Sequence, residues 1–127
     1  MTATLWVAFG GALGSVARYW LSLFMAPLSK ELPWSTITIN IAGSFVIAFF
    51  GVLTFSHTKL PVSENIRLFV MVGVCGGFTT FSSFSLQSFE LLKKGALAFA
   101  FANIALSVVL CIAATAIGFY LGQKLNH

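Results

Sequence analysis

The chain has 127 residues, of which 58% are hydrophobic and only 8% are charged. So few charged side chains cannot cover the surface of a soluble domain of this size, and the surrounding solvent is therefore expected to be lipid. The formal net charge of +4 comes from basic residues that are scattered along the chain, which argues against a patch for binding nucleic acid.

Four apolar segments are each long enough to cross a bilayer core about 30 Å thick, which needs roughly 20 residues of helix. A polar stretch, residues 57–65, separates the second segment from the third. The sequence therefore predicts an all-α membrane protein that forms a single transmembrane domain over residues 1–127. The predicted spans are about 5–25, 34–55, 66–92 and 96–121.

The first span contains one charged residue, Arg18, well inside its apolar sequence. A charged side chain in a membrane has to reach the interface, pair with another group or face water. This arginine is expected to attract anions into a vestibule. Gly10 and Gly14 form a GxxxG pair on the same span, which indicates a close helix-packing face rather than a binding site.

The second span contains Asn40 in its first third, where an amide needs hydrogen-bond partners. Its two N–H donors suit an anion, which predicts a place in a pore. A hydrogen bond that joins two helices is an equally favoured interpretation.

The third span has a middle that forms helix poorly, from Gly76 to Ser83. A break there would free several backbone carbonyls near the bilayer midplane, where each needs a partner. In an antiparallel dimer two such breaks would meet and offer carbonyl oxygens to one sodium-like cation. A glycine hinge or packing site without an ion is the alternative.

Phe81 and Phe84 follow this stretch and, three residues apart, lie on neighbouring faces of a resumed helix. The positive edge of a phenyl ring suits a dehydrated anion, and the hydroxyls of Ser82, Ser83 and Ser85 are nearby. Because the chain contains 14 phenylalanines, packing or contact with lipid is the competing interpretation.

The fourth span has a polar stripe in which Ser107, Cys111 and Thr115 recur every four residues, with Asn103 a turn earlier. Such a stripe suits the wall of a narrow pathway. Hydrogen bonds from these side chains to carbonyls of their own helix explain the pattern equally well.

The basic residues near the span ends do not favour one orientation in the membrane. With four spans they divide equally between the two sides: Lys59, Arg67 and Lys124 on one, and Lys30, Lys93 and Lys94 on the other. Because the positive-inside rule then has no preference, both orientations and an antiparallel homodimer of the two are predicted. A weakly biased single orientation is the alternative.

The run GGFTTFSSFS at residues 76–85, the stretch TITIN that ends at Asn40, and Arg18 together resemble the Fluc (CrcB) family of fluoride channels. The resemblance extends over the whole chain and includes its length, its four spans and the order of the motifs. It implies a dual-topology homodimer in the inner (plasma) membrane, with two antiparallel pores that export fluoride passively. It also implies a structural sodium ion at the centre of the dimer.

Carried over by position, the resemblance assigns the sodium-binding backbone carbonyls to Gly76 and Thr79 and the aromatic pair beside the pore to Phe81 and Phe84. Gln87 stands where several members of the family have a glutamate, so a role for a carboxylate is not expected there. The expected pore residues are Asn40, Phe81, Phe84, Ser82, Ser83, Ser107 and Thr115, with Arg18 in the vestibule.

The leading competing function is a small multidrug-type proton-coupled antiporter, which has a similar length, four spans and dual topology. Such an antiporter needs a carboxylate inside the membrane, but the one acid associated with a span, Glu90, lies near a helix end. A redox membrane enzyme is disfavoured because the spans contain no paired cysteines and no histidine. The sequence predicts a channel rather than an enzyme, with fluoride, the bilayer and a second copy as its partners.

Overall fold

The computed structural model describes residues 1–55 and 60–127, which contain helices and no β-strand. Residues 57–59 of the predicted polar stretch, Lys59 among them, lie outside the described residues. The prediction of an all-α fold is confirmed for the described residues. In chain order the elements are α1 (Thr2–Met25), η1 (Ala26–Leu28), α2 (Trp34–Thr54), α3 (Glu64–Arg67), η2 (Leu68–Cys75), α4 (Gly76–Phe78), α5 (Phe81–Lys93) and α6 (Leu97–Asn126).

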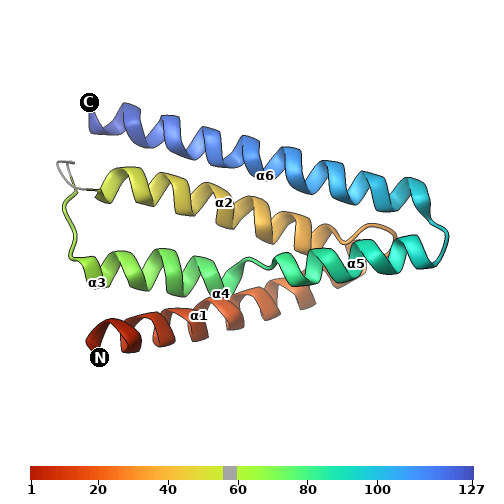
Figure 1. Cartoon of the computed structure of the whole chain (residues 1–127), viewed down its shortest axis with the longest axis horizontal. Helices are drawn as coiled ribbons and strands as arrows, with labels where there is room; N and C mark the ends of the chain where they lie inside the picture. The colour runs from red at the N-terminus through yellow and green to blue at the C-terminus, as the bar shows by residue number, and fades with distance from the viewer. Residues whose placement is uncertain (56–59) are drawn as a thin grey trace.

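These elements form four long helical stretches that run side by side (Figure 1). Three of them are long and apolar enough to cross a membrane, namely Trp34–Thr54, Glu64–Lys93 and Leu97–Asn126. Large apolar side chains are exposed on every long stretch, as expected where the outer surface contacts lipid. α6 continues beyond its predicted end at 121, because Gln123 and Lys124 favour helix.

α1 packs through glycines against the third stretch, which is Glu64–Lys93 and comprises α3, η2, α4 and α5. Gly10 and Gly14 are buried, and a Cβ atom added to either would collide with backbone carbonyl groups of η2. On the facing helix, a Cβ atom on Gly77 would lie 2.5 Å from the carbonyl oxygen of Gly11. The absence of side chains therefore allows the two backbones to approach closely. The prediction of a packing face at Gly10 and Gly14 is confirmed.

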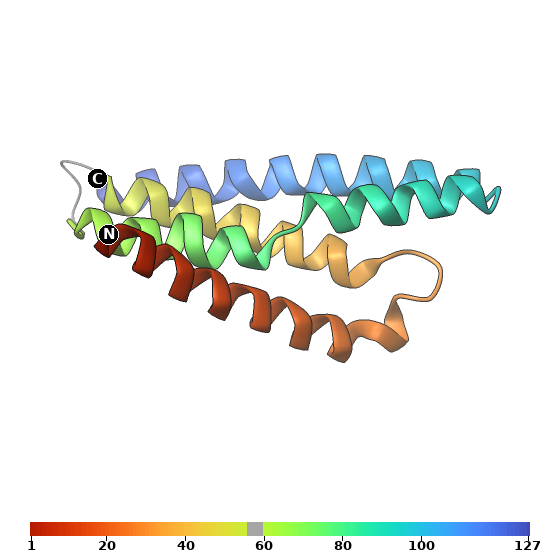
Figure 2. The ribbon, with the colours of Figure 1, turned by 60° about the horizontal axis from the view of Figure 1, so that its bottom comes forward.

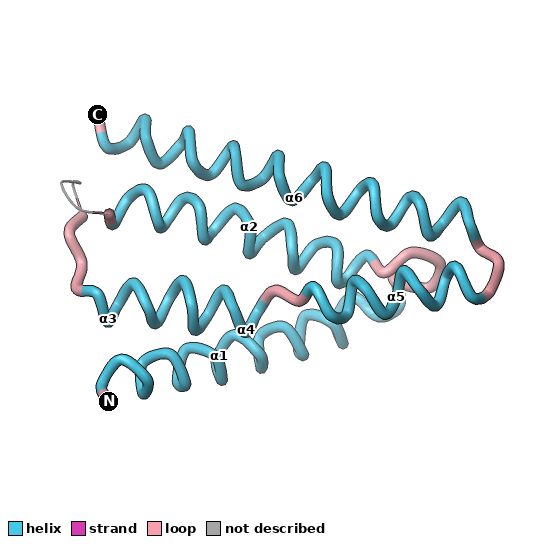
Figure 3. The backbone as a smooth tube through the Cα atoms, viewed as in Figure 1, coloured by secondary structure: helices cyan, strands magenta, loops and turns pink. Residues whose placement is uncertain are grey.

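Two residues with extended backbone, 79 and 80, lie between α4 and α5, and we call them the extended link (Figure 3). Thr79 has φ −78° and ψ 157°, and Thr80 has φ −152° and ψ 108°. The extended backbone lies within the predicted stretch from Gly76 to Ser83, at its two threonines, whereas Gly76 and Gly77 are helical. Helix resumes after Thr80 because the Thr80 hydroxyl accepts a hydrogen bond from the Ser83 N–H at 3.1 Å, an N-cap arrangement.

α6 packs along α2 on the side of the molecule opposite α1 (Figure 2). The contact is close at Gly118, where an added Cβ atom would lie 2.6 Å from the carbonyl oxygen of Phe45. A tight turn joins α5 to α6, and Gly95 adopts a φ of 79° there, which favours glycine. The first half of the third stretch contacts α1, and α2 lies between that half and α6, whereas α5 contacts α6 directly.

Candidate functional site

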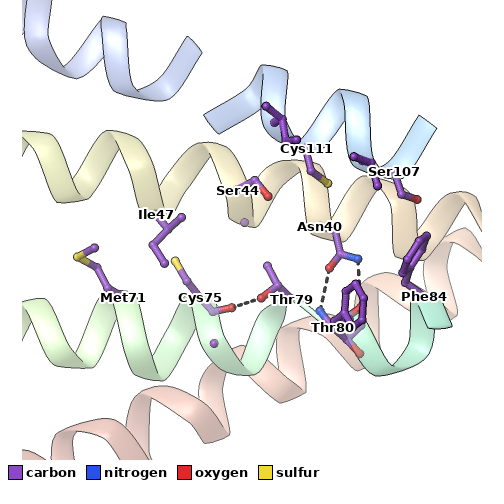
Figure 4. Close-up of a pocket in the computed structure, with 15 residues that line it drawn as sticks. Asn40, Ser44, Ile47, Met71, Cys75, Thr79, Thr80, Phe84, Ser107 and Cys111 are labelled. Atoms are coloured by element: carbon purple, nitrogen blue, oxygen red, sulfur yellow. Dashed lines mark hydrogen bonds between the residues drawn. The ribbon is translucent and has the colours of Figure 1, made fainter. Parts of the chain in front are cut away.

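An open cavity of about 410 Å³ lies between α2, α6 and the third stretch, with the extended link in its wall (Figure 4). This arrangement brings together residues that are far apart in the sequence. The predicted site residues that line the cavity are Asn40, Gly76, Thr79, Phe81, Phe84 and Ser107. Arg18, Ser82, Ser83 and Thr115 are not among its lining residues.

Asn40 joins α2 to the extended link through a reciprocal pair of hydrogen bonds (Figure 4). Its Nδ2 donates to the Thr80 carbonyl oxygen at 3.1 Å, and its Oδ1 accepts from the Thr80 N–H at 2.8 Å. Because a backbone N–H can only donate, this pairing sets the orientation of the amide. The helix-joining interpretation of Asn40 is confirmed, and the second N–H of Nδ2 is left for other partners at the cavity.

Arg18 lies against the carbonyl end of α4. Its Nε donates to the Gly77 carbonyl oxygen at 3.1 Å, and the side chain is half-buried. In a continuous helix the Phe81 N–H would bond this carbonyl, but the extended link removes that partner. The arginine thus replaces a missing backbone donor, a role that sequence reasoning did not assign to it. The predicted vestibule role stays a prediction.

The carbonyls of Gly76 and Thr79 each lose the N–H that a continuous helix would supply four residues later. The N–H of Thr80 donates to Asn40 Oδ1, and the N–H of Ser83 donates to Thr80 Oγ1. Both Gly76 and Thr79 line the cavity. No group of three or more His, Cys, Asp or Glu that could hold a metal occurs in the described part of the chain. The oxygen ligands that this wall can offer to a hard cation are therefore uncharged, and backbone carbonyls are among them.

Phe81 and Phe84 form a tilted ring pair at the cavity, with centroids 5.4 Å apart and an interplanar angle of 49°. Phe84 is half-buried, whereas Phe81 is 77% exposed. A ring so exposed does not fill the core of this chain. The core-packing interpretation therefore fails for Phe81 within one chain, and contact with lipid or with another surface remains.

The polar stripe of α6 divides between two environments. Ser107 and Cys111 line the cavity, whereas the hydroxyl of Thr115 donates to the backbone carbonyl of Cys111 at 2.9 Å and lies 3.5 Å from that of Ser44. Thr115 therefore follows the interpretation in which hydroxyls bond carbonyls of their own helix. Its predicted place in a pore stays a prediction without support from the cavity wall.

Ser82 and Ser83 lie in the first turn of α5 and interact with Thr80. The Ser82 hydroxyl is 3.2 Å from the Thr80 hydroxyl, and the Ser83 N–H donates to the same oxygen. These contacts hold the start of α5.

A buried network that sequence reasoning missed connects α5 to α6. Asn103 Nδ2 donates to Ser88 Oγ at 2.8 Å, and Ser107 Oγ donates to Asn103 Oδ1 at 3.3 Å. Ser88 and Asn103 lie at nearly equal distances in sequence from the turn at Gly95. That symmetry about a tight turn is a sequence signal for their pairing.

Comparison with known proteins places this arrangement in a family. The chain matches the CrcB-like protein family, described as Camphor Resistance (CrcB), over residues 5–119. Three similar proteins are each named fluoride-specific ion channel FluC. The protein from Methylobacterium radiotolerans is 52% identical over 125 residues, covering 98% of this chain and 87% of its own length. That from Gluconobacter oxydans is 53% identical over 126 residues (98% and 88%), and that from Methylocella silvestris is 49% identical over 124 residues (97% and 95%).

Proposed function

This chain belongs to the CrcB-like family, and from that membership we infer that it is an ion channel specific for fluoride. It is a membrane protein and not an enzyme. The observation that carries this conclusion is the match, at about half of all positions, to fluoride-specific channels over nearly the whole chain. The antiporter alternative is not supported by these relatives.

The cavity supports a pathway for a small anion that must exchange water for protein donors. Fluoride is strongly hydrated and accepts hydrogen bonds avidly, so a pore has to offer it several donors. The proposed donors are the second N–H of Asn40, the hydroxyl of Ser107 and the positive ring edges of Phe81 and Phe84. Without a lysine or arginine among the lining residues, the anion is held weakly enough to leave.

Fluoride efflux from liposomes reconstituted with the purified protein tests this function. We expect rapid fluoride efflux and little chloride efflux, because the larger halide fits the donor set poorly. The rate should not require a pH gradient, which separates a channel from a proton-coupled exporter. Protein-free liposomes are the control. Chloride efflux as fast as that of fluoride, or fluoride efflux that stops without a pH gradient, would contradict the proposal.

The working unit is proposed to be an antiparallel homodimer in the inner (plasma) membrane. In each chain, α1 is proposed to cross the membrane in addition to the other three stretches. Two observations support it. The cavity is open at the surface of one chain, so a single copy does not enclose a polar pathway. Phe81, 77% exposed, lies at this cavity, where a second chain would cover it.

Dual topology predicts that a tag after His127 is accessible from both sides of the membrane. The physical reason is the three-to-three balance of basic residues, which gives neither orientation an advantage. Protease protection in sealed vesicles should cleave about half of the tags, and detergent-opened vesicles provide the total. Two lysines added beside Lys124 should shift the fraction and lower efflux. Cleavage of all tags or of none would exclude dual topology.

The proposed dimer also holds a structural sodium ion, bound by the carbonyls of Gly76 and Thr79 from both chains. Their lost helical partners and their place at the cavity support this assignment. When bound, the cation would neutralise carbonyl dipoles that otherwise face one another in lipid.

Thermal unfolding of the purified protein tests the sodium site. Sodium at about 100 times its dissociation constant should stabilise the folded protein by about 3 kcal/mol relative to a bulky organic cation such as N-methyl-D-glucamine. Thr79→Ala should keep that difference, because the substitution leaves the backbone carbonyl in place. Equal unfolding temperatures in the two salts at matched ionic strength would remove the sodium ion from the proposal.

A further inference from the structure

Asn103 is 1% exposed and lies behind the cavity wall rather than in it. Its amide connects two serines, with Nδ2 2.8 Å from Ser88 Oγ and Oδ1 3.3 Å from Ser107 Oγ. Both serines are buried, and of these three residues Ser107 is the one that lines the cavity (Figure 4). The network therefore runs from the buried contact between α5 and α6 to the surface that an anion would meet.

The hydrogen bond from Ser107 to Asn103 has a consequence for anion binding. A serine hydroxyl carries a single proton, and here Ser107 donates it to Asn103 Oδ1. What this hydroxyl then offers to the cavity is lone pairs, which repel an anion. Fluoride is bound at Ser107 only if the proton turns toward the cavity, and the buried Oδ1 of Asn103 then loses its donor, which is costly.

The amide of Asn103 has the geometry to avoid that loss. A primary amide presents an acceptor at one end and donors at the other, and each end of this one faces a serine hydroxyl. When the amide turns over, Ser88 donates to Oδ1 and Nδ2 donates to Ser107 Oγ. Every buried polar atom keeps a partner in both arrangements. In the turned arrangement the Ser107 oxygen accepts a hydrogen bond, which polarises its hydroxyl and makes it a stronger donor to the anion.

We propose that Asn103 is a positioning residue for fluoride conduction. Its amide turns over as the anion passes, so that the Ser107 hydroxyl donates a hydrogen bond to fluoride, with the proton staying on Oγ, and donates to Asn103 again once the anion has left. Ser88 completes the chain, because its hydroxyl both accepts and donates. The inference rests on the proposed pore position of Ser107. Asn103 and Ser88 act through Ser107 and do not touch the anion.

A double-mutant cycle between Asn103 and Ser107 tests the proposal, with fluoride efflux normalised to folded protein as the readout. Ser107→Ala and Asn103→Leu should each slow efflux about tenfold, the effect of losing one hydrogen bond to a charged group. Because Asn103 acts through Ser107, the double variant should be no slower than Ser107→Ala. If Asn103 instead affected efflux independently of Ser107, the two effects would multiply to about a hundredfold.

Thr54→Val is the matched control. It also removes a buried hydroxyl, but that hydroxyl bonds the Phe50 carbonyl of its own helix and is not among the cavity-lining residues, so efflux should stay at the wild-type rate. If Asn103→Leu does not fold, Ser88→Ala takes its place in the cycle, since it removes a single oxygen atom.

The possible outcomes separate this proposal from the function on which it rests. Multiplied effects, or wild-type efflux from Asn103→Leu or from Ser88→Ala, would overturn the positioning role and leave Ser107 in the pore. Unchanged efflux from Ser107→Ala would mean that Ser107 is not part of the pore, and Asn103 would then have no positioning role. A wild-type protein that releases no fluoride would overturn the channel function itself.

Discussion

Fluoride efflux should fall by about a thousandfold when Asn40 is replaced by aspartate. At an effective dielectric constant of 20, a carboxylate about 4 Å from the anion opposes it by about 4 kcal/mol, which corresponds to that factor. The substitution also removes the Nδ2 donor from the Thr80 carbonyl. The acceptor for the Thr80 N–H remains, so part of the connection between α2 and the extended link survives.

Two further variants separate charge from structure in this experiment. Asn40→Leu removes both hydrogen bonds to Thr80 without adding charge, and its efflux reports the cost of losing those contacts. Asn65→Asp adds the same charge in α3, at a position that does not line the cavity, and should leave efflux unchanged. Efflux at the wild-type rate from well-folded Asn40→Asp would mean that Asn40 joins helices and has no place in the pore.

Replacing Phe81 or Phe84 by isoleucine should slow fluoride efflux about fivefold for each ring, and about thirtyfold for both together if the sites act independently. Losing a ring edge beside a mostly dehydrated anion removes a contact of about 1 kcal/mol, which corresponds to that factor for each ring. Isoleucine keeps the position apolar. The packing interpretation instead predicts a stability loss of about 1 to 2 kcal/mol with efflux per folded protein unchanged.

Phe101→Ile provides the control for the aromatic experiment. Phe101 lies on α6, is 64% exposed and does not line the cavity, so it has the exposure of Phe81 without its position. Gel filtration of every variant, followed by efflux normalised to the folded fraction, decides between the two interpretations. Wild-type efflux from intact Phe81→Ile and Phe84→Ile would end the aromatic-pore hypothesis.

The extended link and the end of α4 before it each have a polar partner from a neighbouring helix, which explains how an apolar environment tolerates the interruption. In lipid, every backbone group that leaves a helix needs another partner. Asn40 of α2 pairs with both backbone groups of Thr80, and Arg18 of α1 pairs with the Gly77 carbonyl. The one charged residue in α1 is therefore a structural partner of the third stretch, whatever its effect on anions.

The sequence by itself determined the class of the protein. An 8% share of charged residues and long apolar segments leave a helical membrane protein as the solution, since neither feature depends on how the helices pack. The GxxxG pair at Gly10 and Gly14 also showed a packing face, because the absence of side chains is a local property. The motif at residues 76–85 pointed to the family because a motif is also a local property, read from adjacent residues of the sequence.

Only the tertiary structure decided which polar groups meet. Helix propensity placed the interruption within residues 76–83 without saying where, and in the fold both glycines are helical, with Gly77 packed against Gly11 of α1, while Thr79 and Thr80 are extended. The contact of Arg18 with Gly77 and that of Asn103 with Ser88 depend on the relative offset of separate helices. Propensity and periodicity act over a few residues of one helix and carry no information on that offset.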